Sequence, residues 1–432
     1  MAATAEEDRK KQSPSLTQNL NDFLEYTAIP RRREISRTHE RIIRRAVNPI
    51  VHEIGGFDDR FYVDPIDASG CYVGITHTDE FTFDILVPLP NILTPKILTK
   101  KSEFGLTSSY IDSCTCDNPY IDPLPGFGFV VADPNLTFTH DLCSKRDDCV
   151  LSTVQESFVT HAYLSPVRVL EVFKELVQQA VDKLEEECWW EREPTVYQVE
   201  VEKQGPSVTL TFLLGGETFT ISLLPTIKFP GWPESINDWG LTRGSNVWLT
   251  QERSSIIRQE FHVFAAQPPE DEDASRLWCV CFYPLEKALA ATADEGTFES
   301  CRQKTLAAIE AIYEENSEDF HPVSARLIRT IFLHQCVHYP NDEDWLEKRL
   351  GRAFVDLFLA IIKSLKQAKC QHVFLTDQNM LGNRAKWDLK PVVHHLKAIL
   401  NDIIQNPDKT AFLPVPGRIR KMRRTERKGQ MR

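Results

Sequence analysis

The sequence contains no hydrophobic run long enough to cross a membrane. Its most apolar stretch, residues 353–365, includes Asp356 and Lys363 and is far shorter than the roughly 20 residues that a bilayer-spanning helix needs. The first residues, MAATAEEDRKKQS, contain no apolar segment that could serve as a secretory signal. We therefore expect a protein of the cytoplasm or the nucleus that has no membrane partner.

The composition excludes several other classes of protein. With 42% hydrophobic and 26% charged residues, the chain is neither collagen-like, mucin-like nor wholly disordered. Its 11 cysteines are an odd number, which together with the lack of a signal favours reduced thiols over a disulfide framework. A length of 432 residues exceeds what one hydrophobic core supports and predicts two or three lobes.

Outside the C-terminal segment, acidic residues outnumber basic ones overall. The chain has 50 Lys and Arg against 62 Asp and Glu, a net charge of −12. Residues 418–432 nevertheless carry a single acidic side chain, Glu426, among many basic ones. An acidic body with a basic tail does not match a dedicated nucleic-acid-binding domain, which would be basic overall.

The first regular pattern is a helix over about residues 33–54. Isoleucine and alanine recur there with a mean spacing near 3.6 residues. Pro30 precedes this helix, Gly55 and Gly56 are expected to end it, and Pro49 is expected to bend it.

Strand and helix patterns alternate along the rest of the chain. Apolar residues alternate with polar ones at the end of a strand predicted over 72–87, so that Glu80, Thr82 and Asp84 share the more polar face. Ser165 and Pro166 are a typical helix start. Further strands are predicted at 195–203, 207–214 and 217–229, and further helices at 297–314, 322–338, 344–369 and 390–404.

Five segments in this order resemble the Mab-21 domain family, to which cyclic GMP-AMP synthase also belongs. They are EFTFDILVPL, LLPTIKFPGWPESINDW, WCVCFYPLEKAL, CRQKTLAAIEAIYEE and LIRTIFLHQCVHYPNDEDWLEKRLG with QHVFLTDQNML, spread over residues 33–405. The resemblance implies an α+β, two-lobed nucleotidyltransferase fold, in which a mixed α/β lobe with a twisted sheet is followed by a helical lobe.

On this basis we expect four divisions of the chain. They are a disordered N-terminus over 1–16, an α/β lobe over 17–290 with the spine helix at about 33–54 and an insertion at about 102–160, a helical lobe over 291–408, and a disordered basic tail over 409–432.

The resemblance also implies where catalytic carboxylates would lie. The family pattern is acid–apolar–acid on the first strand with a third acid on a later strand, and these carboxylates hold two metal ions. Here Glu80 keeps the first acid, but Thr82 and Ser222 stand at the other two positions. Asp84 lies about 13 Å from Glu80 along an extended strand, too far for the two to share one metal pair.

The positions that grip the nucleotide in the synthase are also altered. Ser69 and Gly70 are the nearest match to its Gly-Ser phosphate loop, in reversed order. Glu310 stands where the resemblance places a phosphate-binding lysine, and Ala325 and Arg326 replace a Ser-Tyr pair. A negative charge at position 310 would repel phosphate.

Two other features suggest ligands. An arginine stripe with helical spacing lies opposite the isoleucine face and resembles the helix that contributes to double-stranded nucleic-acid binding in the synthase. We favour the other interpretation, a solvated face whose arginines pair with Glu34, Glu40 and the acidic body of the protein. The stripe comprises Arg33, Arg37, Arg41, Arg44 and Arg45. The cysteine spacings at 114, 116, 143 and 149 do not match the usual zinc spacing, and His334 and His338 are expected in a packed helix rather than at a metal.

These observations favour a Mab-21-like protein that has lost catalysis and acts through a protein partner, as an interaction or regulatory module in cell differentiation or development. It would need no cofactor and no zinc. The alternative is a synthase-like receptor that makes a cyclic dinucleotide with Mg²⁺ or Mn²⁺ on sensing double-stranded nucleic acid. In that case Glu80 would bind metal, and Asp79, Asp84 or Glu217 would supply the missing acids. A nucleic-acid-binding protein without catalysis is the third hypothesis.

Overall fold

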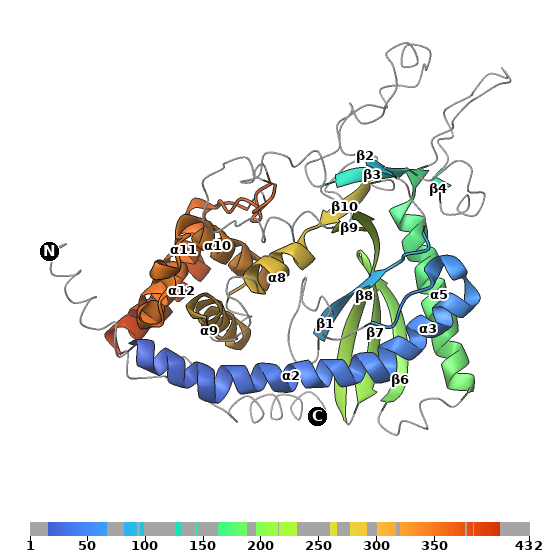
Figure 1. The fold of residues 1–432 in the computed structure, drawn as a ribbon, viewed down its shortest axis with the longest axis horizontal. Helices are drawn as coiled ribbons and strands as arrows, with labels where there is room; N and C mark the ends of the chain where they lie inside the picture. Colours follow the sequence, from blue (N-terminus) through green and yellow to red (C-terminus); the bar gives the residue numbers. More distant parts are fainter. Residues whose placement is uncertain are drawn as a thin grey trace, which may run out of the picture. The chain divides into compact units, whose positions relative to one another are not determined.

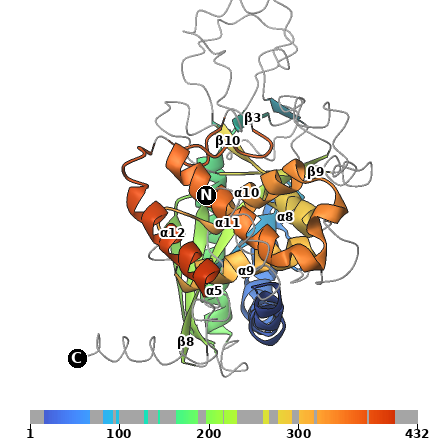
Figure 2. The same cartoon turned by 90° about the vertical axis from the view of Figure 1, so that its left-hand side faces the viewer.

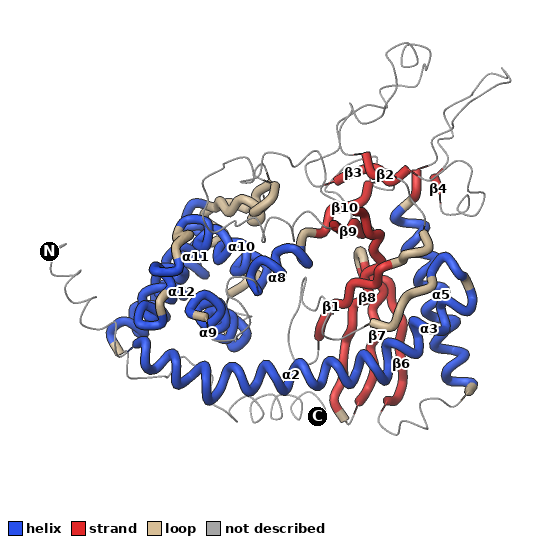
Figure 3. Tube along the Cα trace, in the orientation of Figure 1, coloured by secondary structure: helices blue, strands red, loops and turns tan. Residues whose placement is uncertain are grey.

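The computed structural model describes residues 16–66, 82–92, 96–98, 127–131, 143–144, 163–187, 196–214, 216–230, 260–265, 277–291, 300–316, 320–375, 378–382 and 384–406. The described residues divide into two units. One combines residues 16–37 with 285–406, and the other combines residues 38–230 with 260–284. Figure 1 gives the element labels, and Figure 3 separates helices from strands.

The N-terminal helical segment runs from residue 16 to residue 57, so it starts earlier than the pattern predicts and passes beyond Gly55 and Gly56. It consists of residues 16–23, the π-turn η1 (Leu24–Ala28), α2 (Ile29–Ile42), the π-turn η2 (Ile43–Val47) and α3 (Asn48–Phe57). Each π-turn ends two residues before a proline, Pro30 or Pro49. Proline has no N–H and its ring clashes with the preceding turn, and a π-turn widens that turn. The helix therefore continues through both prolines.

The described strands form one sheet of ten, all in the unit that contains residue 38. The order is β4-β5-β3-β10-β9-β8-β7-β6; in addition β1 pairs with β8 in parallel, and β2 pairs with β3. The strands are β1 (Thr82–Pro88), β2 (Lys96–Leu98), β3 (Phe127–Val131), β4 (Cys143–Ser144), β5 (Tyr163–Leu164), β6 (Val196–Gln204), β7 (Ser207–Leu214), β8 (Glu217–Pro230), β9 (Glu260–Phe264) and β10 (Leu277–Cys281).

One face of β1, β8 and β7 packs against helices. Phe83 of β1 stacks on His39, with ring centroids 3.9 Å apart. The neighbouring α3 and α5 (Pro166–Glu186) run beside the sheet in Figure 1 and contact each other. Ser165 caps α5 by accepting a hydrogen bond from the Arg168 N–H at 3.4 Å, as the sequence predicts. The helix-facing apolar residues on these strands are buried, so this face forms the core of the unit.

Among its described residues, the other unit contains helices and turns and a single isolated β-bridge, between Gln371 and Asn379. Its helices are α8 (Tyr283–Ala291, which begins two residues before the unit), α9 (Cys301–Glu315), α10 (Ala325–His338), α11 (Leu350–Gln367) and α12 (Lys390–Gln405), with 3₁₀ turns η7 (Asp342–Trp345) and η8 (Glu347–Arg349). Figure 2 looks onto this bundle. Residues 16–37 belong with these helices rather than with the α/β lobe that the sequence predicts for 17–290. The Gly351 N–H donates to Thr17 Oγ1 at 3.1 Å, and Lys304 Nζ donates to Asn21 Oδ1 at 3.2 Å.

Within the described ranges, no helix has the length and apolar character that a membrane crossing requires.

Candidate functional site

The candidate site lies on the sheet face that points away from the His39 side. Thr82 and Asp84 are two residues apart on β1, so their side chains share that face. The parallel pairing aligns Thr82 with Thr220 and Asp84 with Ser222. One carboxylate thus stands beside three hydroxyl-bearing residues.

The next strand extends this arrangement without adding a carboxylate. On β7, Thr209 pairs with Ser222 and Thr211 pairs with Thr220. The Thr209 side chain is buried, and its Oγ1 makes no hydrogen bond with a described residue. We call Thr82, Asp84, Thr209, Thr211, Thr220 and Ser222 together the Asp84 face. The edge strand β6 carries a further carboxylate, Glu202, which pairs with Thr209. The Glu202 side chain is exposed to solvent.

Asp84 is more deeply buried than an alternating strand with one polar face predicts. Only 1% of the residue is exposed. The same face becomes apolar one step further along both strands, where Leu86 and Leu224 pack with Phe264, Cys281 and Tyr283 in a buried cluster. Because this cluster adjoins Asp84, the polar part of the Asp84 face is short and borders directly on the hydrophobic core.

The residues of the Asp84 face do not fit a two-metal centre. Mg²⁺ and Mn²⁺ in such sites are held by clustered carboxylate oxygens, and hydroxyl groups are poor substitutes. The face offers one carboxylate, and no group of three His, Cys, Asp or Glu side chains with metal-binding geometry occurs among the residues that the structure describes. Glu80, Ser69 and Gly70 lie outside those residues.

Comparison with protein families matches both units. Residues 73–291 match the Mab-21 protein nucleotidyltransferase domain, and residues 301–398 match the Mab-21 protein HhH/H2TH-like domain. The chain belongs to the Mab-21 family. The α+β fold with a helical second domain, predicted from the sequence, is therefore confirmed.

In this Mab-21 family member, Glu310 is committed to an internal ion pair. Its Oε1 accepts a hydrogen bond of 2.7 Å from Arg329 Nε, which joins α9 to α10. The Glu310 side chain is 9% exposed and that of Arg329 16%. The carboxylate is thus held in the bundle by a cation of its own chain.

Arg326 is engaged in a second buried network, which sequence analysis missed. Its Nη2 lies 3.1 Å from His372 Nε2 and 3.7 Å from Glu286 Oε1, and His372 Nε2 lies 3.1 Å from the same oxygen. Only 1% of each of Glu286 and His372 is exposed. Glu286 and His372 lie in two of the segments that resemble the family, WCVCFYPLEKAL and QHVFLTDQNML, but they are far apart in the sequence and neither segment by itself indicates the pairing.

The network fixes the protonation of both groups. His372 Nδ1 accepts hydrogen bonds from the N–H groups of Phe374 and Leu375, at 3.1 and 3.2 Å, so the ring proton sits on Nε2. Burial lowers the pKa of His372 despite the nearby Glu286 carboxylate. Burial also acts to raise the pKa of Glu286, but the charge of Arg326 and the His372 contact outweigh it, and the net shift is downward. The neutral imidazole and the carboxylate are therefore the native forms.

The arginine stripe on the N-terminal helix is interrupted. The side chains of Arg33, Arg37 and Arg41 follow the periodicity of α2 and are exposed, whereas Arg44 and Arg45 lie within η2. A π-turn departs from the spacing of an α-helix, so the spacing that predicts a single stripe does not extend unchanged from α2 to Arg44 and Arg45. Arg33, Arg37, Arg41 and Arg44 form no ion pair with another described residue, contrary to the expected pairing with Glu34 and Glu40.

The remaining sequence candidates occupy structural positions or lie outside the described residues. His334 Nε2 lies 2.8 Å from the Gln371 carbonyl oxygen, and Cys336 is fully buried in α10, as expected for a packed helix. Trp278 is buried and donates to the Leu164 carbonyl at 2.8 Å. The cysteines at 114, 116 and 149 and the basic tail lie outside the described residues.

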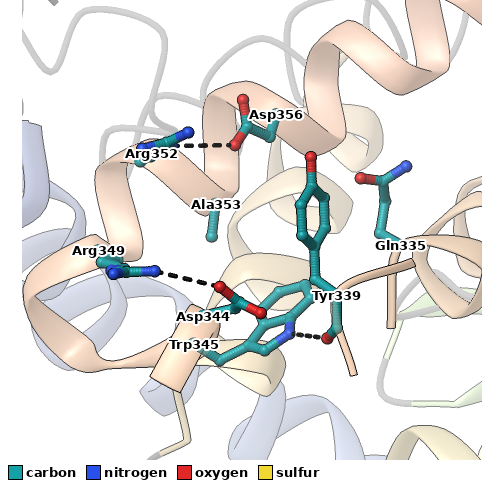
Figure 4. Close-up of a pocket in the computed structure, with 8 residues that line it drawn as sticks. All are labelled: Gln335, Tyr339, Asp344, Trp345, Arg349, Arg352, Ala353 and Asp356. Atoms are coloured by element: carbon teal, nitrogen blue, oxygen red, sulfur yellow. Dashed lines mark hydrogen bonds and ion pairs between the residues drawn. The ribbon is translucent and has the colours of Figure 1, made fainter. Parts of the chain in front are cut away.

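A pocket on the helical unit lies between Tyr339, Trp345 and α11 (Figure 4). Its charged groups are already paired with one another, Arg349 with Asp344 at 3.2 Å and Arg352 with Asp356 at 3.5 Å. Trp345 Nε1 donates to the Tyr339 carbonyl at 2.8 Å. The pocket therefore offers a ligand no uncommitted charge.

Proposed function

We propose that this Mab-21 family member does not catalyse two-metal nucleotidyl transfer and instead acts, in the cytoplasm or nucleus, as an interaction or regulatory module in cell differentiation or development. The observation that carries the loss of catalysis is the pairing of Asp84 with Ser222. To share a metal ion with a carboxylate of β1, a second carboxylate on β8 would have to lie at or beside the position of Ser222. The role in development rests on the family alone.

The helical unit supports the same proposal. Glu310 stands at the position where the synthase has a phosphate-binding lysine. It is negatively charged and forms an ion pair with Arg329. Arg326 is held by Glu286. Rearranging either group to meet a triphosphate would leave a buried charge without its partner, which typically costs several kcal/mol.

The alternative function, a synthase-like receptor, draws on two observations. Asp84 supplies a buried carboxylate on the first strand, and Glu80 lies four residues before it in the sequence. The exposed arginines of α2 that form no ion pair with a described residue would suit phosphate contacts. Under this alternative, binding to double-stranded nucleic acid would weaken steeply with salt.

The deciding experiment incubates the full chain with ATP and GTP, with Mg²⁺ or Mn²⁺, and with a panel of double-stranded DNA and RNA, followed by product analysis. We expect neither linear nor cyclic dinucleotides. A product that disappears in both Glu80→Ala and Asp84→Asn but persists in Glu202→Gln, a charge change on the exposed edge strand, would overturn the proposal and establish the alternative.

A further inference from the structure

The pocket between Tyr339, Trp345 and α11 has an aromatic wall that is fixed in place (Figure 4). The indole N–H of Trp345 donates to the Tyr339 carbonyl at 2.8 Å, and the Arg302 guanidinium lies 5.3 Å from the ring centroid. Phe332 meets the same ring edge to face, with centroids 6.1 Å apart. On α11 the pocket is lined by Ala353, whose side chain is small. A wall held in this way requires little further ordering when a ligand binds.

Two uncharged polar groups of the pocket make no hydrogen bond to another described residue. They are the side-chain amide of Gln335 and the hydroxyl group of Tyr339, which lie one turn apart at the end of α10. Each of them can both donate and accept. The four charged side chains of the pocket, by contrast, form two ion pairs with each other. A charged ligand would lose its hydration without meeting a free counter-charge, which is costly.

The size of the pocket limits what can enter it. Its volume is about 80 Å³, compared with about 150 Å³ for an engineered apolar cavity that encloses benzene. A single ring can therefore enter in part, whereas a nucleotide or a drug-sized compound would remain mostly outside. An uncharged ring with a hydrogen-bonding edge fits both the volume and the polar groups of the pocket.

The surface beside the pocket is apolar. The described residues of the helical unit include five exposed large hydrophobic side chains, and three of them lie at the pocket or next to it. Tyr339 lines the pocket, and Leu346 directly follows Trp345. Leu359 lies on α11 one turn beyond Asp356, on the same side of the helix. Apolar patches with a polar rim are typical of protein interfaces, whereas a nucleic acid would require free cations for its phosphates.

We propose that this pocket docks a partner protein, which inserts one tyrosine or tryptophan side chain and covers Leu346 and Leu359 with apolar residues. The inserted ring packs against Trp345, and its O–H or N–H group donates to the Gln335 amide oxygen or the Tyr339 hydroxyl. Phenylalanine lacks the polar edge, and a charged side chain finds no free counter-charge. A buried aromatic anchor of this kind commonly dominates the binding energy of an interface.

This docking site rests on the proposed role as an interaction module and not on the loss of catalysis. A dinucleotide product would refute the loss of catalysis and leave the docking test unchanged. Failure of the docking test would in turn say nothing about catalysis.

The test selects binders of the full-length protein from a random peptide library displayed on phage and compares their affinities for the wild type, Ala353→Leu and Ala398→Leu. Ala353→Leu fills the pocket, whereas Ala398→Leu makes the same exchange at an exposed position of α12. We expect peptides that bind the wild type and Ala398→Leu equally and bind Ala353→Leu about tenfold more weakly or worse. These peptides should share a tyrosine or tryptophan with apolar neighbours, and thermal unfolding should show that both variants are folded.

A second variant, Gln335→Leu, keeps the approximate size of the side chain but removes its amide. It should weaken a selected tyrosine or tryptophan peptide about 2- to 10-fold and leave the version of that peptide with phenylalanine unchanged. Gln405→Leu, at an exposed position of α12, should affect neither peptide. The proposal is overturned if no selected peptide distinguishes Ala353→Leu from Ala398→Leu, or if charged residues of the peptide account for the difference. Binding of a single-stranded oligonucleotide that Ala353→Leu alone abolishes would assign the pocket to a nucleobase instead.

Discussion

Arg329 Nε donates a 2.7 Å hydrogen bond to Glu310 Oε1, so the residue that resembles a phosphate-binding lysine in position is instead one half of a largely buried ion pair between α9 and α10. The geometry explains how a carboxylate is tolerated there. It also gives a direct test of whether Glu310 is structural.

Glu310→Ala should lower the free energy of unfolding by about 3 kcal/mol, because it leaves Arg329 without its partner in a mostly buried position. The double variant Glu310→Leu with Arg329→Met should recover much of this loss, since two apolar side chains leave no unpaired charge. Asp356→Asn, which removes an exposed pair with Arg352, should cost less than about 1 kcal/mol. Urea unfolding of the three variants provides the measurement; equal stability of the single and double variants would contradict the interpretation.

His372 should make the protein less stable in mild acid. Its pKa in the folded protein is below the ordinary 6.5, so the unfolded chain binds more protons and stability falls as the pH drops through 6.5. His372→Asn offers an oxygen in place of Nδ1 but does not titrate, and it should flatten the change between pH 7 and pH 5. Thermal unfolding at several pH values measures the difference from wild type, and identical slopes would contradict the prediction.

Glu286 should change the pH dependence of stability only at a lower pH than His372 does. Its pKa is held below the ordinary 4.5, so its contribution to stability is fully present above about pH 4.5 and is lost as the pH falls below that value. Glu286→Gln should therefore be less stable than wild type at pH 6, with a gap that narrows toward pH 3. A gap that stays constant across this range would show that packing, rather than charge, determines the effect.

Gly55 and Gly56 are adjacent in α3 but should respond differently to substitution. A Cβ at Gly55 would lie 3.0 Å from Tyr62 Cδ2 and 3.1 Å from Tyr62 Cα, whereas a Cβ at Gly56 meets nothing within 4 Å. We expect Gly55→Ala to destabilise the protein by about 1–3 kcal/mol, and Gly56→Ala to be neutral or to stabilise it by up to about 1 kcal/mol. Thermal unfolding of the pair tests the close approach of Tyr62, and similar melting temperatures would argue against it.

Asn379 should hold the connection between α11 and α12 together. Its Oδ1 accepts from the N–H of Cys370 at 2.9 Å, and its Nδ2 donates to the carbonyls of Ala368 and Gly382 at 3.0 Å each. Asn379→Ala should cost about 2–3 kcal/mol, since several backbone groups lose their partner. Asn379→Asp keeps the acceptor, so amide hydrogen exchange at Cys370 should speed up in Asn379→Ala and much less in Asn379→Asp.

Local patterns predicted the secondary structure well where they were strong. The strands expected at 207–214 and 217–229 are β7 and β8 within one residue, and the helix expected to begin at Ser165-Pro166 is α5. Residues 344–349 were predicted as helix but form the 3₁₀ turns η7 and η8 before α11 begins at Leu350. The π-turns before Pro30 and Pro49 were not foreseen, because a proline alone does not indicate whether a helix will break or widen.

The sequence by itself determined the family, the order of the elements, and the replacement of two expected acids by Thr82 and Ser222, because periodicity and motifs are local properties of the chain. Only the tertiary structure placed Ser222 opposite Asp84 and aligned both with Thr209, since strand register depends on the whole sheet and a slip of one residue would reverse every face. The pairing of Glu286 in α8 with His372, which lies beyond the end of α11, was likewise decided by tertiary packing. Charges that are far apart along the chain acquire their partners, or fail to, only when the helices that carry them come together.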